Sequence, residues 1–166
     1  MKLTIIIPAL NEAATVGQVL KDIPDSIPGI SEIIAVVIDD GSTDETKTIS
    51  EGEGAVVIRH LKNTGLGSAF RSGLTYAINS GTDIMVNIDA DGQFYPQDIP
   101  TLVAPIVNGD AECTTASRFI DKNLYPDMHW LKFYGNKAMS LLISFLTGQR
   151  FNRSAFLRCF MWNACL

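Results

Sequence analysis

Four apolar stretches rich in isoleucine and valine recur along the first half of the chain. None of them alternates apolar with polar residues, as a strand with one wet face would. Each is therefore predicted to be a strand that is buried on both faces. The stretches are Leu3–Pro8, Ile33–Ile38, Ala55–Ile58 and Ile84–Ile88.

Segments of helical character lie between these strands, at Glu12–Ile23, Asp44–Glu51 and Ser68–Asn79. Strands that alternate with helices are typical of a parallel sheet covered on both faces, so an α/β fold is expected. Proline is favoured in a first helical turn, which predicts another helix over Pro96–Val107. A fifth strand is expected at Glu112–Ser117.

Polar clusters follow each of the four strands directly. In a parallel sheet the carboxyl ends of the strands meet at one edge, where ligands bind. We therefore expect four loops to converge on one rim of the sheet. The clusters are Asn11–Glu12, Asp39–Ser42, Asn63–Gly67 and Asp89–Gln93.

The length and composition favour a single domain. The chain has 166 residues, of which 46% are hydrophobic, enough to close one core. Cys113, Cys159 and Cys165 have no ligand-like spacing, so neither a disulfide framework nor a zinc site is indicated, and a cytoplasmic location is expected. No stretch approaches the roughly 18 to 20 apolar residues of a membrane span.

The net charge of −5 hides a strong asymmetry. Residues 1–117 contain 6 Lys/Arg and 16 Asp/Glu, a net −10, whereas residues 118–166 contain 7 and 2, a net +5. The basic end suits an anionic partner such as phosphate or a lipid headgroup, although a solvated surface without a partner remains an alternative. A nucleic-acid partner is not expected.

The segment Asp89-Ala90-Asp91 places two acids on the same side of an extended chain. Two bare carboxylates repel each other, and a hard divalent cation removes that conflict while also binding phosphates. An EF-hand is excluded because Gly92 is the fourth loop residue rather than the sixth and Pro100 occupies the twelfth position. A helix-capping role would explain one acid but not both.

The polar segment after the second strand allows both a structural and a ligand-binding interpretation. In Asp39–Asp44, Ser42 or Thr43 could cap the next helix, whereas Asp39 could accept hydrogen bonds from a ribose or a base.

The glycine loop Asn63–Ser68 resembles a dinucleotide-binding loop, but Phe70 replaces its third glycine. Close backbone packing is therefore favoured for these glycines, and an NAD-dependent oxidoreductase is disfavoured. His60 and His129 have no partners at ligand spacing and are interpreted as ordinary surface or core residues.

Six segments together resemble the family 2 glycosyltransferases. The similarity is greatest to the branch of dolichyl-phosphate mannose synthases and bacterial polyprenyl-phosphate glycosyltransferases, and it spans about residues 3 to 150. The segments are "PALNEAATV" (8–16), "VVIDDGSTDET" (36–46), "NTGLGSAFRSG" (63–73), "NIDADGQFYPQDI" (87–99), "ASRF" (116–119) and "GNKAMSLLISFLTG" (135–148).

The resemblance implies a GT-A fold, a GDP- or UDP-sugar donor, Mg²⁺ or Mn²⁺ and inversion at the anomeric carbon. It implies that Asp89 and Asp91 bind the metal with Gln93 as a further ligand, and that Asp91 and Arg118 are catalytic. The nucleotide-binding residues it implies are Pro8, Leu10, Glu12, Val37, Asp39, Asp89, Ala90, Asp91 and Arg118.

The acceptor expected from this branch is a polyprenyl or dolichyl phosphate, in glycan or cell-envelope biosynthesis. A lipid phosphate is already anionic near neutral pH and needs cations rather than a general base. The candidate cations are Arg118, Lys132, Lys137 and Arg150. Residues 130–146 have the spacing of an interfacial helix that would hold the protein at the cytoplasmic face of a membrane, and a buried core helix is the alternative.

The family pattern fails after Phe151, where Asn152 and Arg153 stand in place of an expected acid. Residues 1–150 are therefore expected to form the glycosyltransferase domain, and residues 151–166 an atypical tail of a truncated or frame-disrupted product. The GT-A fold would then be incomplete at its acceptor side. Two alternatives to lipid glycosylation stay open: an inactive module that binds nucleotide sugar, and a family 2 transferase with a hydroxyl acceptor.

Overall fold

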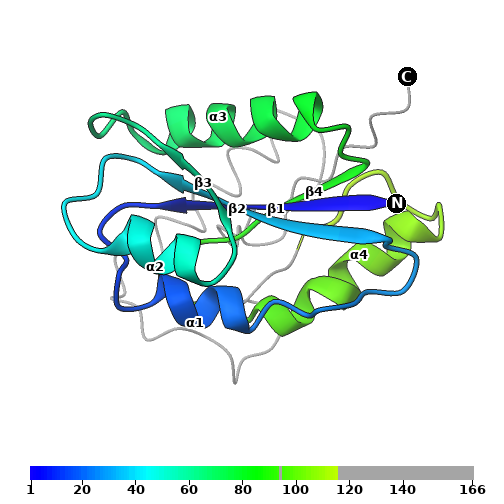
Figure 1. Cartoon of the computed structure of the whole chain (residues 1–166). Helices are drawn as coiled ribbons and strands as arrows, with labels where there is room; N and C mark the ends of the chain where they lie inside the picture. Colours follow the sequence, from blue (N-terminus) through cyan, green and yellow to red (C-terminus); the bar gives the residue numbers. More distant parts are fainter. Residues whose placement is uncertain (94, 116–166) are drawn as a thin grey trace, which may run out of the picture. The chain divides into compact units, whose positions relative to one another are not determined.

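The computed structural model describes residues 1–93 and 95–115, and Met1–Thr114 belong to one compact unit. Its centre is a four-stranded sheet in the order β3-β2-β1-β4, in which all the paired strands are parallel (Figure 1). The strands are β1 (Lys2–Ala9), β2 (Glu32–Asp39), β3 (Val56–Arg59) and β4 (Ile84–Asn87). These four match the predicted strands to within one residue at each end.

The inner strand β1 is buried on both faces. Consecutive side chains of a strand point to opposite faces, and Ile5, Ile6 and Ile7 are all fully inaccessible to solvent. The prediction of burial on both faces therefore holds for β1 and for the second half of β2, whereas the edge strand β3 is only partly buried, with Val56 and Arg59 exposed.

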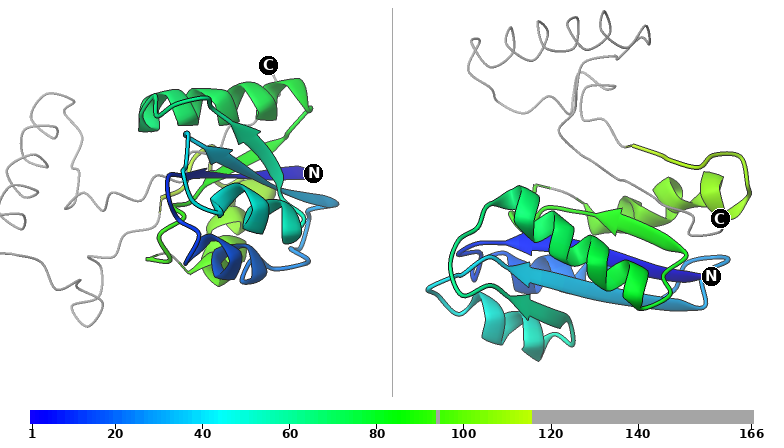
Figure 2. Two further views of the ribbon diagram at one scale, coloured as in Figure 1. Left: turned by 60° about the vertical axis from the view of Figure 1, so that its left-hand side comes forward. Right: turned by 90° about the horizontal axis from the view of Figure 1, so that it is seen from above.

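Helices cover both faces of the sheet, as predicted (Figures 1 and 2). Helix α3 lies on one face, and α1, α2 and α4 lie on the other. A short 3₁₀ helix, η1 (Pro96–Asp98), leads into α4. The helices are α1 (Val16–Lys21), α2 (Thr46–Gly52), α3 (Leu66–Asn79) and α4 (Ile99–Val107).

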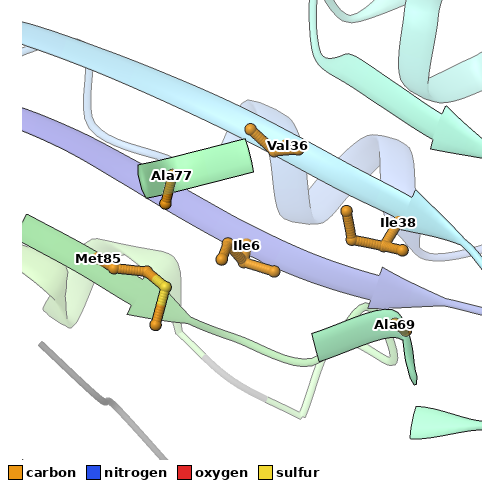
Figure 3. Packing of buried hydrophobic residues seen from close by; sticks show 6 residues of the cluster. All are labelled: Ile6, Val36, Ile38, Ala69, Ala77 and Met85. Carbon is orange, nitrogen blue, oxygen red and sulfur yellow. The ribbon is translucent and has the colours of Figure 1, made fainter. Parts of the chain in front are cut away.

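Helix α3 packs closely on the sheet because its inner face is made of small residues. Ala69, Gly73 and Ala77 recur every four residues and are buried. A Cβ atom placed on Gly73 would lie 2.5 Å from Cγ2 of Ile6 in β1, well inside contact distance. Figure 3 illustrates the resulting cluster of Ile6, Val36, Ile38, Ala69, Ala77 and Met85.

Helix α1 begins four residues later than expected. Residues 12–15 form a turn whose backbone is held by the loop after β2. The Glu12 N–H donates to the Thr46 hydroxyl over 2.9 Å, and the Ala13 N–H donates to Asp44 over 3.1 Å. These contacts between distant segments are invisible to helical periodicity.

The prediction of a strand over Glu112–Ser117 is wrong for residues 112–115, which contain no strand. The Thr114 hydroxyl instead donates a 2.7 Å hydrogen bond to the carbonyl of Leu102 in α4. This hydrogen bond links the segment after α4 back to the helix.

No helix in residues 1–93 and 95–115 is long and apolar enough to cross a membrane. Several predictions lie outside these residues: the role of Arg118, the segment 130–146, the other basic residues near the end, and the tail after Phe151.

Candidate functional site

The loops that follow the four strands gather at one edge of the sheet, as predicted. Asp39 at the end of β2 pairs with Ala9 of β1 on one side and with Arg59 of β3 on the other. The ladder continues one step further, because the Asp40 N–H donates to Ala9 O (2.9 Å) and the His60 N–H donates to Asp39 O (2.8 Å). We call this edge the carboxyl rim.

The loop after β1 is tied to the loop after β2. Asn11 has a positive φ of 58°, which asparagine tolerates better than most residues. Its N–H donates to the Ser42 hydroxyl (2.9 Å), and its side-chain carbonyl accepts from the Thr43 N–H (2.8 Å). Ser42 and Thr43 therefore join two loops rather than cap α2, whose start has no side-chain cap. The capping interpretation of these residues is wrong.

Asp44 also links the loop after β1 to the loop after β2. The Thr46 hydroxyl donates to its carboxylate and lowers its pKa, burial raises the pKa by less, and the backbone N–H groups of Thr46 and Ala13 lower it further. The ionised carboxylate thus fixes the first turn of α2 and the approach to α1.

Asp39 lies beneath the rim and is fully buried. Its Oδ1 accepts a 2.7 Å hydrogen bond from the Ser42 N–H. Its Oδ2 is 3.3 Å from Nε of Arg59, which forms an ion pair without the alignment of a hydrogen bond. The Arg59 side chain is half-exposed and also donates to the Ser42 carbonyl (2.9 Å). Asp39 therefore retains a buried acceptor oxygen with no hydrogen bond, beside the half-exposed side chain of Arg59.

Asp40 points to the face of the sheet opposite to that of Asp39, and its carboxylate is occupied by hydrogen bonds within the protein. Its carboxylate accepts from the N–H and hydroxyl of Thr64 and from the N–H of Gly65 (2.7 Å), just before α3 begins. Burial raises the pKa of Asp40, but hydrogen bonds from Thr64, His60 and Gly65 outweigh it and lower the pKa from 3.8 to about 2. Asp40 thus fixes the backbone of the two residues just before α3, from the loop that follows β2.

His60 links this carboxylate to α3. Its Nδ1 is 2.6 Å from Asp40 Oδ1, and its Nε2 is 2.8 Å from the Ser72 hydroxyl. Sequence reasoning assigned His60 no role. One feature of the sequence could have indicated a role. Successive residues of an extended chain point to opposite faces, so Asp40 must find hydrogen-bond donors on a different face from Asp39.

Gly41 allows the loops after β2 and β3 to touch. It has a φ of +84°, and a Cβ there would lie 2.6 Å from the backbone carbon of Lys62. The close packing expected at Gly65 and Gly67 is absent, because nothing lies within 4 Å of a Cβ on either. It is found at Gly73 instead.

The acid pair lies on the loop after β4. Asp89 and Asp91 are partly exposed and flank the buried Ala90, and Asp91 Oδ1 accepts the N–H of the exposed Gln93 over 2.9 Å. Neither acid caps the following helical turn, which begins after Tyr95 without a side-chain cap.

The donor set at this loop fits a phosphate-bound divalent cation. Among the described residues, no group of three or more His, Cys, Asp or Glu side chains could hold a metal ion. Magnesium typically takes only one or two carboxylates and completes its shell with water and substrate phosphates. The pair Asp89 and Asp91 matches that requirement.

The remaining residues expected to bind nucleotide differ in accessibility. Leu10 is 38% exposed, Pro8 and Glu12 are partly buried, and Val37 is fully buried within β2. The Glu12 carboxylate accepts the Thr15 hydroxyl over 2.9 Å. Leu10 and Glu12 therefore stand at the rim, whereas Val37 lies beneath it.

A separate pocket of about 480 Å³ lies along α4, and none of the acids at the carboxyl rim lines it. Its lining is largely apolar, without the paired acids that metal chemistry requires. The lining residues are Ile27, Pro28, Pro100, Thr101, Ala104, Pro105, Asn108 and Asp110.

Comparison with known proteins identifies similar chains. The sequence profile of Glycosyl transferase family 2 matches residues 4–164. The UDP-N-acetylglucosamine–dolichyl-phosphate N-acetylglucosaminyltransferase of Methanococcus voltae is 32% identical over 161 residues, covering 87% of this chain and 62% of the relative. The dolichol-phosphate mannosyltransferase of Pyrococcus furiosus is 36% identical over 124 residues, covering 72% and 34%.

A solved structure has the same fold. Glucosyl-3-phosphoglycerate synthase from Mycobacterium tuberculosis, in complex with Mn²⁺ and UDP-glucose, aligns with a TM-score of 0.52 and 31% identity. The alignment covers 66% of this chain and 40% of the synthase. The chain spans less than two thirds of the length of each of these three proteins.

Proposed function

Because the chain belongs to glycosyl transferase family 2 and to its polyprenyl-phosphate branch, we propose that it transfers a hexose from a GDP- or UDP-sugar to a polyprenyl phosphate. The enzyme class, a glycosyltransferase with a GT-A fold, follows from the family. The donor, the metal requirement and the acceptor at this site are our proposal. Such an enzyme would work at the cytoplasmic face of a membrane, where its lipid substrate resides.

The observation that carries the proposal is the position of the acid pair. Asp89 and Asp91 follow β4 on the edge of the sheet where all four strand ends meet, partly exposed on either side of a buried residue. Ligands of open parallel sheets bind at this edge. The M. tuberculosis synthase with Mn²⁺ and UDP-glucose gives independent support for a divalent cation in this fold.

The two acids would hold Mg²⁺ or Mn²⁺, with Gln93 beside them. When bound, the cation would stabilise the charge that develops on the departing diphosphate. The protein's own part is to place the carboxylates: the Gln93 N–H fixes one oxygen of Asp91 and leaves its other oxygen for a ligand.

Asp39 would recognise the nucleoside. Its Oδ2 is an acceptor without a hydrogen bond, and the neighbouring Arg59 side chain is half-exposed. A base N–H or ribose hydroxyl could satisfy this oxygen once Arg59 moves aside. Leu10 and Glu12, on the adjacent loop, would contact the same nucleoside.

Transfer itself would be a displacement at the anomeric carbon. An anionic phosphate oxygen of the lipid forms the new carbon–oxygen bond while the bond to the nucleoside diphosphate breaks on the opposite face. No proton has to be removed from the acceptor, so no general base is required. Arg118, predicted from the family resemblance, would balance the phosphate charge.

A transfer assay separates this proposal from its alternatives. Radiolabelled GDP-mannose, UDP-glucose and UDP-N-acetylglucosamine are each incubated with polyprenyl phosphate and Mn²⁺, and labelled lipid is extracted. Formation of lipid-linked sugar that stops with EDTA and in Asp91→Asn supports the proposal. Donor binding without any transfer would indicate the nucleotide-sugar-binding module. Transfer to a sugar hydroxyl acceptor offered in a parallel reaction, but not to the lipid, would indicate a family 2 transferase with a hydroxyl acceptor.

A further inference from the structure

Large apolar side chains are unusually exposed where β3 leads into α3. Leu61 is 105% exposed and Leu66 is 67% exposed, relative to a residue in an open chain. We call residues 60–66 the Leu61–Leu66 loop. Isolated exposed leucines are common, but here two of them flank one short loop at the carboxyl rim, and Leu66 is also the first residue of α3.

The backbone of this loop is firmly held, so the exposure is not the result of a loose segment. Asp40 accepts hydrogen bonds from the N–H groups of Thr64 and Gly65, and its contact with His60 fixes the start of the loop. Gly41 packs against the backbone of Lys62. A loop ordered in advance loses little conformational entropy when it docks on a surface.

The charge around the loop is the reverse of that of the rest of the described chain. Residues 54–82 contain Arg59, Lys62 and Arg71 and no Asp or Glu, whereas residues 1–115 as a whole contain 6 Lys/Arg and 16 Asp/Glu. Lys62 is exposed beside Leu61. Leu61 and Leu66 both lie in this acid-free stretch, whereas its other two exposed large hydrophobic residues, Val56 and Ile78, lie at the start of β3 and near the end of α3.

We propose that the Leu61–Leu66 loop docks on an anionic phospholipid bilayer, with Leu61 and Leu66 entering the headgroup region and Lys62 contacting lipid phosphate. An anionic membrane repels most of this acidic surface, so contact is favourable where acids are absent. Apolar side chains beside a cation are the combination that interfacial segments use. This inference rests on the proposed function for its purpose, since docking at the rim would bring a lipid phosphate to the edge of the sheet that holds the acid pair.

Vesicle co-sedimentation of the full 166-residue chain tests the proposal. The vesicles contain either phosphatidylcholine alone or phosphatidylcholine mixed with phosphatidylglycerol. We expect binding to the anionic vesicles, weakened about tenfold or more in the double variant Leu61→Ser/Leu66→Ser, because two leucine side chains no longer enter the lipid. Lys62→Glu should weaken binding to anionic vesicles and leave binding to neutral ones unchanged.

Two control variants make the same kinds of substitution outside the Leu61–Leu66 loop. Ile78→Ser removes an exposed aliphatic side chain near the far end of α3, and Lys47→Glu reverses a charge on α2; both should bind as the wild type does. Circular dichroism verifies that each variant is folded. Equal binding by the loop variants and the wild type would overturn the proposal and place any membrane contact elsewhere, as would a wild type that fails to bind anionic vesicles.

A local probe gives a second readout. In a chain with its three cysteines replaced by serine, an environment-sensitive fluorophore on Leu61→Cys should shift to shorter wavelength when anionic vesicles are added, and one on Ser26→Cys should not. No shift at position 61 contradicts the proposal. Titration of the wild type and the double variant with nucleotide sugar is run in parallel, so failure to bind donor would refute the proposed function without affecting the vesicle result.

Discussion

Asp39 and Asp40 are neighbours in the sequence, yet the strand sends them to opposite faces of the sheet. Asp40 is satisfied by Thr64, Gly65 and His60 and holds the start of α3. Asp39 is buried on the other side and retains one carboxylate oxygen without a hydrogen bond. One acid is therefore structural, and the other is the candidate for nucleoside recognition.

The structural role of Asp40 can be measured through pH. Replacement Asp40→Asn should lower the free energy of unfolding by about 1–3 kcal/mol at neutral pH, because charged hydrogen bonds to a helix start are lost. The folded-state pKa of about 2 lies below the ordinary value of 3.8, so this stabilisation is full above pH 3.8 and is lost as the pH falls towards 2.

Urea unfolding at a series of pH values checks this expectation. The wild type should lose more stability than Asp40→Asn between about pH 4 and pH 2, because the variant has no carboxyl to protonate there. Parallel curves for the two proteins across that interval would show that Asp40 does not stabilise the fold in this way.

At the scale of elements, the fit between α3 and β1 depends on a missing side chain. Gly73 lies against Ile6, whereas Gly67, in the same helix, has nothing within 4 Å of where its Cβ would be. The two glycines therefore have different reasons to be present, and the same substitution should act on them in opposite directions.

Gly73→Ala should destabilise the protein by about 1–3 kcal/mol, since the added methyl group overpacks the contact with Ile6. Gly67→Ala should stabilise it by up to about 1 kcal/mol, because alanine favours the helix and meets no neighbour. Thermal unfolding of both variants provides the comparison. A Gly73→Ala variant as stable as Gly67→Ala would mean that α3 does not pack this closely.

Sequence patterns predicted the elements that depend on local composition. The four strands are correct because continuous runs rich in isoleucine and valine favour the strands of a covered parallel sheet. The start of α1 and the lack of a strand at residues 112–115 were missed because tertiary hydrogen bonds act there: Asp44 and Thr46 hold the backbone before α1, and Thr114 binds α4. Such contacts leave no periodic signal.

For the whole molecule, the parallel sheet explains how one rim collects residues that lie far apart in the sequence. The position of Asp89 and Asp91 was predictable, because strand ends in a parallel sheet share an edge. The contacts of the loops after β2 and β3 were not predictable: those that join Asp40, His60 and Ser72 depend on how loops pack after the sheet has formed. The rim also carries two loops of opposite charge: the loop after β4 holds the acid pair, and the loop after β3 is basic and apolar.

The central claim is that Asp89 and Asp91 hold a divalent cation that binds the donor's diphosphate. Isothermal titration calorimetry with the nucleotide sugar that proves active, with Mn²⁺ or with EDTA, tests this claim most directly. We expect EDTA and the double variant Asp89→Ala/Asp91→Ala each to weaken donor binding by about tenfold or more, as loss of charge-assisted contacts worth at least ~1.4 kcal/mol would. The exposed Asp98→Ala should bind as the wild type does. Donor affinity that is the same with EDTA and in the double variant would contradict the account.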